Sequence, residues 1–460
     1  MPKIQERPGG LYSGLKSYMD SFSSCPSLKA INDLARVGWL STTIGEQKKE
    51  SIKLKLLSQL NAYPVFISEE TVNMSLGFCD KVIWPVFHYF TSNMAFDDDY
   101  WINYKKVNVA FRNAILEILK PDDIIWIHDY HLMLLPKYIR DKVPDASIGF
   151  FLHIPFPSFE IFSLIPCRCR EEILEGLLGA DLIGFHIHDY KQHFLNCVFQ
   201  GIGHHHDLGM IVINDRLVKV DAYPMGIDFE GFKDAAIWPE VQEEKYRLCK
   251  LVAGRKVVLS ICRLDYTKGI INSLQGYKIF LQKNPQYVGR IVLILIVVPS
   301  PSRTIIDRYQ QIKKQIDESV GRINSEIGSI SWAPIIYHDN FIPFIELIAL
   351  YNISDIALIT PLRDGMNLIA KEYIAARTDG KGVLVLSEMA GASKELKDAI
   401  IIDPNDVKGI AIALKDALEM PTEEIIKHNQ VMQARLKHYS IVRWGDEFIH
   451  DLLSLKKKPS

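Results

Sequence analysis

The chain has 460 residues, of which 48% are hydrophobic, and this length suits two or three domains with full cores. Its net charge of −2 gives no overall field for nucleic acid, and its longest strand-like apolar run, Ile291–Pro299, is too short to span a bilayer. The start MPKIQERPGG lacks the apolar core of a signal peptide, and the seven cysteines form no CxxC pair, so we expect a cytoplasmic protein with free thiols and neither nucleic-acid nor membrane partners.

The first half of the chain alternates helices and strands. A glycine turn, Gly9–Leu15, enters a helix, and Gly9 and Gly10 would let the backbone approach a ligand closely. The next predicted elements, in chain order, are a helix at Val107–Leu119, a strand at Asp123–His128, a helix at about His131–Asp141, a strand at Ser147–His153, a helix at Glu171–Gly179 and a strand at Asp181–Phe185. Continuous apolar strands between helices indicate a parallel sheet that is covered on both faces.

A second series of strands follows Ala222–Phe232, whose Pro and Gly suit a linker with a hinge near Met225–Asp228. The predicted strands of this series are Lys256–Cys262, Arg290–Val298, Ala333–Tyr337, Ile356–Thr360, Gly382–Leu386 and Ala399–Ile402. We therefore predict an α/β protein with two doubly wound domains.

Polar residues follow several of these strands. In doubly wound sheets, ligands bind beyond the carboxyl ends of the strands. Five residues have that placement, namely Asp129, His153, Arg263, Arg303 and Asp364. Their shared position is a stronger indication of a binding site than any one of them alone.

The segment Pro361–Glu372 joins a predicted strand to a helix that starts near Asn367. Unpaired N–H groups at such a helix start attract a phosphate, and here they belong to Gly365, Met366, Asn367 and Leu368. Asp364 and Glu372 could accept hydrogen bonds from sugar hydroxyls, so the segment has the donors and acceptors of a nucleotide-sugar site. The alternative is an ordinary capped helix with a surface Asp and Glu.

Two cations, Arg263 and Lys268, share the loop after another strand and could bind a diphosphate and stabilise it as a leaving group. The alternative pairs Arg263 with Asp265 in a structural turn. Arg303 could meet a second phosphate or be a surface arginine.

Other candidates have equally plain alternatives. Asp129 could bind a sugar hydroxyl or cap the next helix, and a strand-end histidine such as His153 is often structural. Trp84 could stack on a sugar or belong to the core.

Taken together, these segments resemble the trehalose-6-phosphate synthase family of retaining glycosyltransferases, glycosyltransferase family 20. The motifs GGLYSGL, GWL, IWPVFHYF, WIHDYHLMLLP, FFLHIPFPS, LLGADLIGFH, AYPMGID, RLDYTKGI, TPLRDGMNLIAKEY, LSEMAGASKEL and RWGDEFIHDLL occur in the family's order. The resemblance implies the GT-B arrangement of two Rossmann-like domains with the active site in the cleft between them. It places these domains at 1–224 for the acceptor and 225–440 for the nucleotide sugar, and it implies that 441–460 form a helix returning to the N-terminal domain and a tail.

The resemblance also implies the reaction and its residues. Glucose would pass from a nucleoside diphosphate glucose, expected to be UDP-glucose, to glucose 6-phosphate with retention and without a metal or other cofactor. The implied catalytic residues are Arg263, Lys268, His153 and Asp364, with His153 and Asp364 holding the transferred glucose. The donor would be bound by these two cations, Asp364 and Gly9, Gly10, Ile342, Gly365, Met366, Asn367, Leu368 and Glu372, and the acceptor by Trp84, Asp129 and Arg303. A homo-oligomer, or a complex with a separate trehalose-phosphate phosphatase, is the expected assembly.

The sequence departs from the family pattern at several positions. The family's first strand, which ends in a Ser-Asn-Arg loop, has no counterpart before Gly9, and we expect the first sheet to be short at a central position. Ser75 stands where the family has Tyr, and Cys262 where it has Asp. Each lost contact to the acceptor phosphate is expected to reduce affinity by ~10- to 100-fold. Two alternatives therefore stay open: a transferase with another phosphorylated acceptor, and a noncatalytic regulatory subunit that resembles the synthase.

Overall fold

The structure is a computed structural model that describes residues 10–21, 34–40, 45–299 and 307–456. Contacts group the chain into two units. The C-terminal unit contains Met225–Arg443 with the segment up to Ser17, and the N-terminal unit contains Tyr18–Pro224 with Trp444 onward. The division at Met225 lies at the start of the predicted hinge, whereas the sequence reasoning had assigned all of 1–224 to the N-terminal domain.

The sheet of the C-terminal unit has six parallel strands in the order β11-β10-β9-β12-β13-β14. Their bounds are β9 (Lys256–Arg263), β10 (Ile291–Val298), β11 (Ile335–His338), β12 (Ile356–Ile359), β13 (Val383–Ser387) and β14 (Ile400–Ile402). Each lies within two residues of a predicted strand at both ends. The doubly wound parallel sheet that was predicted here is confirmed.

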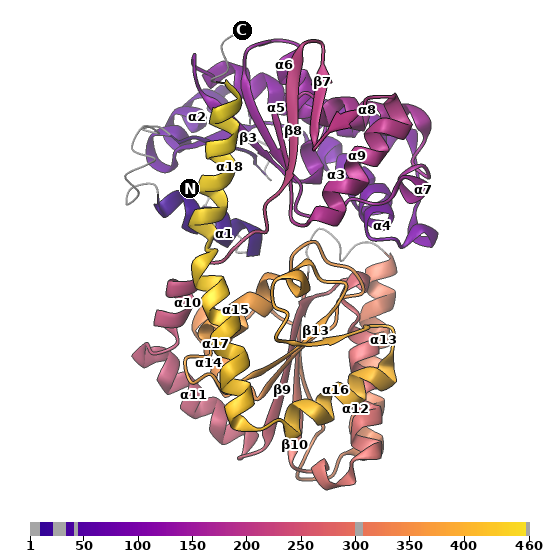
Figure 1. The fold of residues 1–460 in the computed structure, drawn as a ribbon, viewed down its shortest axis with the longest axis vertical. Coiled ribbons are helices and arrows are strands. Elements are labelled where there is room, and N and C mark those ends of the chain that lie inside the picture. Colours follow the sequence, from indigo (N-terminus) through magenta and orange to yellow (C-terminus); the bar gives the residue numbers. More distant parts are fainter. Residues whose placement is uncertain (1–9, 22–33, 41–44, 300–306, 457–460) are drawn as a thin grey trace. The chain divides into compact units, whose positions relative to one another are not determined.

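Helices cover both faces of this sheet (Figure 1). One face carries α12 (Ile270–Lys283), α13 (Asp307–Ile327) and α16 (Val407–Glu419). The other side carries α10 (Phe229–Ala235), α11 (Pro239–Val252), α14 (Phe344–Ile353), α15 (Leu368–Ala376) and α17 (Thr422–His438). The strands are apolar on both sides because both sides are covered, so burial explains the unbroken run Ile291–Val298.

The larger sheet of the N-terminal unit has the order β3-β4-β5-β8-β7-β6. Its strands are β3 (Ile124–His128), β4 (Ser147–Phe151), β5 (Leu182–Phe185), β6 (His206–Asp207), β7 (Met210–Ile213) and β8 (Arg216–Ala222). The first three and β8 are parallel, and β7 and β6 extend the sheet as antiparallel strands. The sequence pattern predicts no strand at β6, β7 or β8.

A separate two-stranded parallel sheet pairs β1 (Arg36–Trp39) with β2 (Ala62–Val65). Within the described ranges, β1 and β2 pair only with each other, and β3 is an edge of the larger sheet. The N-terminal strands are therefore divided between two sheets, where a single sheet with a short centre had been expected.

The helices of this unit include α2 (Glu46–Leu60), α3 (Glu69–Phe78), α4 (Trp84–Phe87), α5 (Asp98–Ile118), α6 (Leu135–Arg140), α7 (Phe159–Phe162), α8 (Cys167–Leu177) and α9 (His188–Ile202). The predicted helix at His131–Asp141 is shorter than expected, since a 3₁₀ turn occupies Tyr130–Leu132 before α6 begins. No helix among the described residues combines the length and hydropathy that crossing a bilayer requires.

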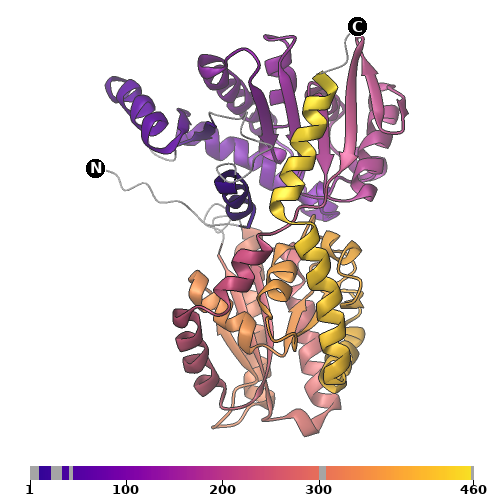
Figure 2. The ribbon, with the colours of Figure 1, turned by 60° about the vertical axis from the view of Figure 1, so that its left-hand side comes forward.

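The two terminal helices are α1 (Gly10–Ser21) and α18 (Ile441–Lys456), and both can be followed in Figure 2. From Trp444 onward, α18 packs on the face of β3, β4 and β5. The ring of Phe448 stacks on Trp126 with a centroid distance of 4.7 Å, and a Cβ at Gly149 would lie 2.7 Å from the same ring. The C-terminal helix is therefore part of the N-terminal unit's core.

Candidate functional site

The loops that follow β9 and β12 lie side by side in the C-terminal unit, because these two strands are neighbours in the sheet. The strand order changes direction between them, with β10 and β11 on one side and β13 and β14 on the other. Leu362 N donates to Thr267 O at 2.7 Å, and a Cβ at Gly269 would lie 2.1 Å from Thr360 O. This close approach, with φ of 65° at Gly269, requires glycine. The crevice at such a change of strand direction is where doubly wound sheets bind ligands.

An ion pair joins the two loops. Lys268 Nζ lies 2.7 Å from Asp364 Oδ2, and the two side chains are only 10% and 14% exposed. Asn367 Nδ2 donates to the same carboxylate oxygen at 3.1 Å. Burial by itself would raise the pKa of Asp364, but the Lys268 ammonium outweighs it and holds that pKa below its ordinary value. Asp364 is therefore a fixed anion beside a fixed cation.

Arg263 is the last residue of β9, and it is exposed. Its charge also lowers the pKa of Asp364, after the larger effect of the Lys268 ammonium, so both cations act on the same carboxylate. Asp265 is buried and accepts from Thr267 N at 3.0 Å. The Asp265 carboxylate therefore caps the 3₁₀ turn Tyr266–Lys268.

The start of α15 has the predicted arrangement of donors. Asn367 is the N-cap, and its Oδ1 accepts from Ala370 N at 3.0 Å. Within the described part of the chain, the backbone N–H groups of residues 365–368 donate to no other group. The helix is thus both capped and able to offer unpaired N–H groups to an anion.

Glu372 lies on the second turn of α15, and its carboxylate is half-buried. Its Oε2 accepts from Tyr351 Oη at 2.9 Å. Burial raises the pKa of Glu372 to about 7, against the smaller opposing effect of the Tyr351 hydrogen bond. A carboxyl group with this pKa changes its charge close to neutral pH.

The remaining predicted donor residues lie in different parts of the chain. Ile342 is buried two residues before α14 begins, and Met366 is buried beside Asn367. Gly10 is the first residue of α1. Gly9 and Arg303 lie outside the described residues.

In the N-terminal unit, Asp129 and His153 lie together at the ends of β3 and β4. His153 N donates to Asp129 Oδ1 at 3.4 Å. Asp129 has φ of 70° and ψ of 170°, a region that is almost restricted to glycine and costs about 1–3 kcal/mol. Its side chain forms no cap hydrogen bond to the turn that follows, so the capping interpretation is wrong. Strain of this kind at a strand end is typical of a functional position.

His153 is held by a second histidine that the sequence reasoning did not assign to the site. His128 Nδ1 lies 3.1 Å from His153 Nε2, and the two rings stack at 5.3 Å. Burial lowers the pKa of His128 to about 3 and that of His153 well below its ordinary value, with His186 and His128 adding to the effect on His153. Both imidazoles are therefore neutral at physiological pH.

Trp84 is 3% exposed, and its ring lies against His88 with a centroid distance of 4.0 Å and a tilt of 31°. Most of Trp84 therefore belongs to the core. Ser75 is also buried, on α3.

The structure adds two residues of the C-terminal unit that the sequence reasoning missed. One is Tyr351, which resembles a core residue in an apolar helix. The other is Lys371, which is fully buried on α15, pairs with Glu395 and donates to Met225 O at 2.7 Å. A lysine among the apolar residues of α15 was the signal for it in the sequence.

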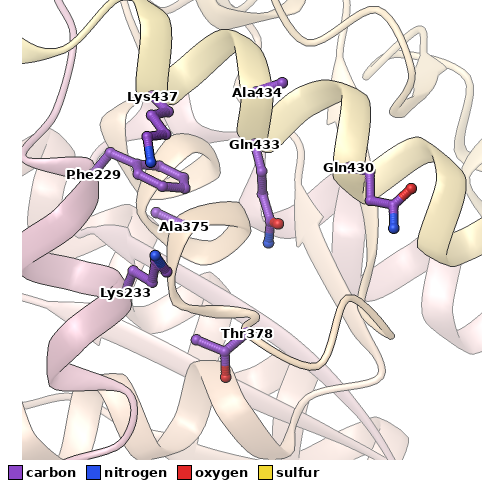
Figure 3. A pocket seen from close by; sticks show the side chains of 8 residues that line it. All are labelled: Phe229, Lys233, Ala375, Thr378, Gln430, Gln433, Ala434 and Lys437. Atoms are coloured by element: carbon purple, nitrogen blue, oxygen red, sulfur yellow. The ribbon is translucent and has the colours of Figure 1, made fainter.

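A pocket of about 300 Å³ lies between α10, α15 and α17 (Figure 3). Lys233 and Lys437 line it, and both pair with Glu230, at 3.2 Å and 3.0 Å. Its remaining walls are Phe229, Ala375, Thr378, Gln430, Gln433 and Ala434. None of the predicted site residues lines this pocket.

Within the described residues, no group of three His, Cys, Asp or Glu side chains is placed to hold a metal ion. The described cysteines are free thiols. Burial raises the pKa of Cys262, at the end of β9, to about 12, so this thiol is neutral where the family pattern has Asp.

Residues 3–454 match the model of glycosyltransferase family 20. The chain is 43% identical over 455 residues to the bifunctional trehalose-6-phosphate synthase/phosphatase of Thermoproteus tenax, covering 99% of this chain but only 61% of that relative. It is 37% identical to the UDP-forming alpha,alpha-trehalose-phosphate synthase of Candida albicans, covering 99% of this chain and 96% of that one. A solved E. coli structure described as trehalose-6-phosphate bound with UDP-2-fluoro glucose superposes with a TM-score of 0.88 at 32% identity, covering 100% of this chain and 98% of that one.

Proposed function

Because this chain belongs to glycosyltransferase family 20, we propose that it transfers glucose from UDP-glucose to glucose 6-phosphate and so makes trehalose 6-phosphate. The anomeric configuration of the glucose would be retained. The observation that carries this proposal is the group of Lys268, Asp364 and Asn367 at the start of α15, with Arg263 beside it. These residues offer cations and unpaired N–H groups to a diphosphate and a fixed carboxylate to a sugar.

In the proposed reaction, the bond between the glucose C1 and the diphosphate breaks as the acceptor hydroxyl enters on the same face. Arg263 and Lys268 would stabilise the charge that develops on the departing diphosphate, and the diphosphate oxygen would take the acceptor's proton. The two carboxylates of the C-terminal site each have a non-acidic partner, Lys268 for Asp364 and Tyr351 for Glu372. This supports a substitution without a carboxylate nucleophile and acid pair.

We assign binding roles to the other residues on the same basis. Glu372 would accept hydrogen bonds from the ribose, while Asp364 and His153 would hold the transferred glucose. Asp129, Trp84 and Arg303 would contact the acceptor. Because Arg263 and Lys268 supply the positive charge, we propose that the reaction needs no metal ion, and activity is expected to survive EDTA.

A second candidate is a transferase that uses the same donor with another phosphorylated acceptor. It is favoured by Ser75, because the short, buried serine side chain cannot place a hydroxyl where the longer Tyr of the family does. The proposed partner in either case is a separate trehalose-phosphate phosphatase, since the Thermoproteus relative is named for both activities. A cytoplasmic location and a homo-oligomer remain predictions.

The test is release of UDP from UDP-glucose in the presence of glucose 6-phosphate, compared with other hexose phosphates at equal concentration. The proposal expects glucose 6-phosphate to be the best acceptor and the product to be α,α-linked. Faster release with another acceptor would support the second candidate. Binding of UDP-glucose without UDP release for any acceptor would indicate a regulatory subunit. A product with inverted anomeric configuration would exclude the proposed same-face substitution.

A further inference from the structure

The hydroxyl of Tyr351 is the one protein group within hydrogen-bonding distance of the Glu372 carboxylate among the residues that the structure describes. The Oη–Oε2 distance is 2.9 Å, and Tyr351 is 1% exposed, at the end of α14. Glu372 Oε1 accepts no hydrogen bond from the described residues. One carboxylate oxygen is therefore held by the protein, and the other is left for a ligand.

The position of Tyr351 is fixed by the packing of α14 against α15. Arg377 Nη1, at the end of α15, donates to Tyr351 O at 3.1 Å and to Ser354 O at 2.6 Å. Tyr373 Oη also donates to Ser354 O, at 3.0 Å. Because these bonds hold the end of α14, the Tyr351 hydroxyl is preorganised for Glu372 and needs no rearrangement when a ligand arrives.

The charged groups around α15 are committed elsewhere. On α15 itself, Lys371 pairs with Glu395 of the neighbouring turn. Arg377 pairs with Asp379, and Glu346 of α14 lies 3.6 Å from Arg247.

On α10 and α17, which pack near α15, Lys233 and Lys437 pair with Glu230. Strands β12 and β13 carry no charged residue. Among the described side chains, Tyr351 is thus the one whose hydrogen bond lowers the pKa of Glu372 and favours its charged form.

We propose that Tyr351 is a positioning residue for the nucleotide: its hydroxyl sets the orientation and the charge of the Glu372 carboxylate that binds the ribose. The inference rests on the proposed function, because it takes Glu372 as the ribose acceptor. A charged carboxylate accepts the two ribose hydroxyls better than a neutral carboxyl group does. Nucleotide affinity should therefore rise as the pH rises through the titration of Glu372, which burial places near 7.

The experiment is calorimetric titration with UDP, and with uridine as a probe without phosphates, from about pH 5 to about pH 9. Tyr351→Phe removes the hydrogen bond that favours the charged form. Its affinity profile should move to higher pH by about one unit, with affinity ~5-fold lower at pH 7. Glu372→Gln should give uridine an affinity that does not change with pH.

Tyr373→Phe removes a buried hydroxyl on α15. Since that hydroxyl bonds to Ser354 O and helps to hold the end of α14, a smaller shift in the same direction is expected. The control outside this network is Tyr277→Phe, which removes another buried hydroxyl of the same unit, one that donates to Pro334 O at 3.2 Å, and it should lower stability without moving the pH profile. Equal shifts in Tyr351→Phe and Tyr277→Phe would overturn the inference, because they would show a general effect of loosened packing.

A second variant covers the case in which Tyr351→Phe does not fold. Replacing Tyr351 with 3,5-difluorotyrosine keeps the hydroxyl and makes it a stronger donor, so the profile should move to lower pH. An unchanged profile would overturn the role of Tyr351 while leaving the proposed function intact. Failure of the wild-type protein to bind UDP at any pH would overturn the proposed function first, and the inference with it.

Discussion

Lys268 Nζ and Asp364 Oδ2 lie 2.7 Å apart although the two residues are separated by 96 positions in the sequence. The pair connects the loop after β9 with the loop after β12, and so connects the proposed diphosphate site with the proposed sugar site. The close approach of the two loops requires glycine at position 269.

Arg263→Ala should lower turnover by about 10²-fold or more, because the departing diphosphate would lose a charge-stabilising donor. Steady-state UDP release at saturating UDP-glucose is the measurement. Arg322→Ala, an exposed arginine on α13, is the control and should leave turnover unchanged. Near-normal turnover in Arg263→Ala would remove its central role.

Lys268→Met should lower the free energy of unfolding by about 3–5 kcal/mol at pH 7, because it leaves Asp364 charged, buried and without its cation. Since the pKa of Asp364 is held below its ordinary value, the stabilisation is complete above about pH 4 and is lost as the pH falls through the folded-state pKa. The deficit of the variant should therefore shrink in acid. Urea unfolding at several pH values would measure it.

Lys256→Met is the control for that experiment. Its ammonium lies 2.7 Å from Asp355, the same distance as in the Lys268 pair, but Lys256 is 59% exposed. Solvent screening should limit its loss to below about 1 kcal/mol. Equal losses in the two variants would mean that burial does not decide the strength of the Lys268 pair.

Glu372→Gln should be more stable than the wild type at pH 8 by about 1–2 kcal/mol, and close to it at pH 5. The reason is that burial raises the pKa of Glu372 to about 7, so folding favours the neutral form. The advantage of that neutral form is complete below the unfolded pKa and is lost as the pH rises through 7. Thermal unfolding at both pH values tests this, and a variant that is less stable at pH 8 would contradict it.

Asp129→Gly should raise the free energy of unfolding by about 1 kcal/mol and weaken glucose 6-phosphate binding. Glycine relieves the strain at φ of 70°, while loss of the side chain removes the proposed sugar contact. Asp122→Gly, at φ of 71° in an exposed turn, should stabilise the protein without changing binding. Unchanged glucose 6-phosphate affinity in Asp129→Gly would exclude it from the acceptor site.

The strands of the C-terminal unit could be predicted closely because they are buried on both faces and stand out as apolar runs, as Ile291–Val298 does. The strands β6, β7 and β8 escaped prediction because they are short or half exposed, and their antiparallel pairing depends on partners elsewhere in the sheet. The sequence also did not predict that β1 and β2 form a sheet apart from β3, because the choice of a strand's hydrogen-bonding partner depends on contacts between distant segments.

The chemistry of the site could be predicted only in part. Lys268, Asp364 and Asn367 were found because the ends of neighbouring strands meet at one edge of a sheet. Tyr351 and His128 were missed because each acts through a partner more than 20 residues away, Glu372 and His153. An aromatic residue in an apolar segment is the ordinary pattern of a core, and only the packing of α14 on α15 distinguishes Tyr351 from it.

Among the described residues β1 pairs only with β2, and this has a consequence for the order in which the N-terminal unit opens. Two strands of four residues each share few ladder bonds, and a two-stranded sheet is marginally stable in isolation. Their amide hydrogens should therefore exchange with deuterium earlier than those of β4 and β5, which have a neighbour on each side. Local opening of this unit would begin at Arg36–Trp39 and Ala62–Val65, well before the sheet that carries Asp129 and His153 loses its structure.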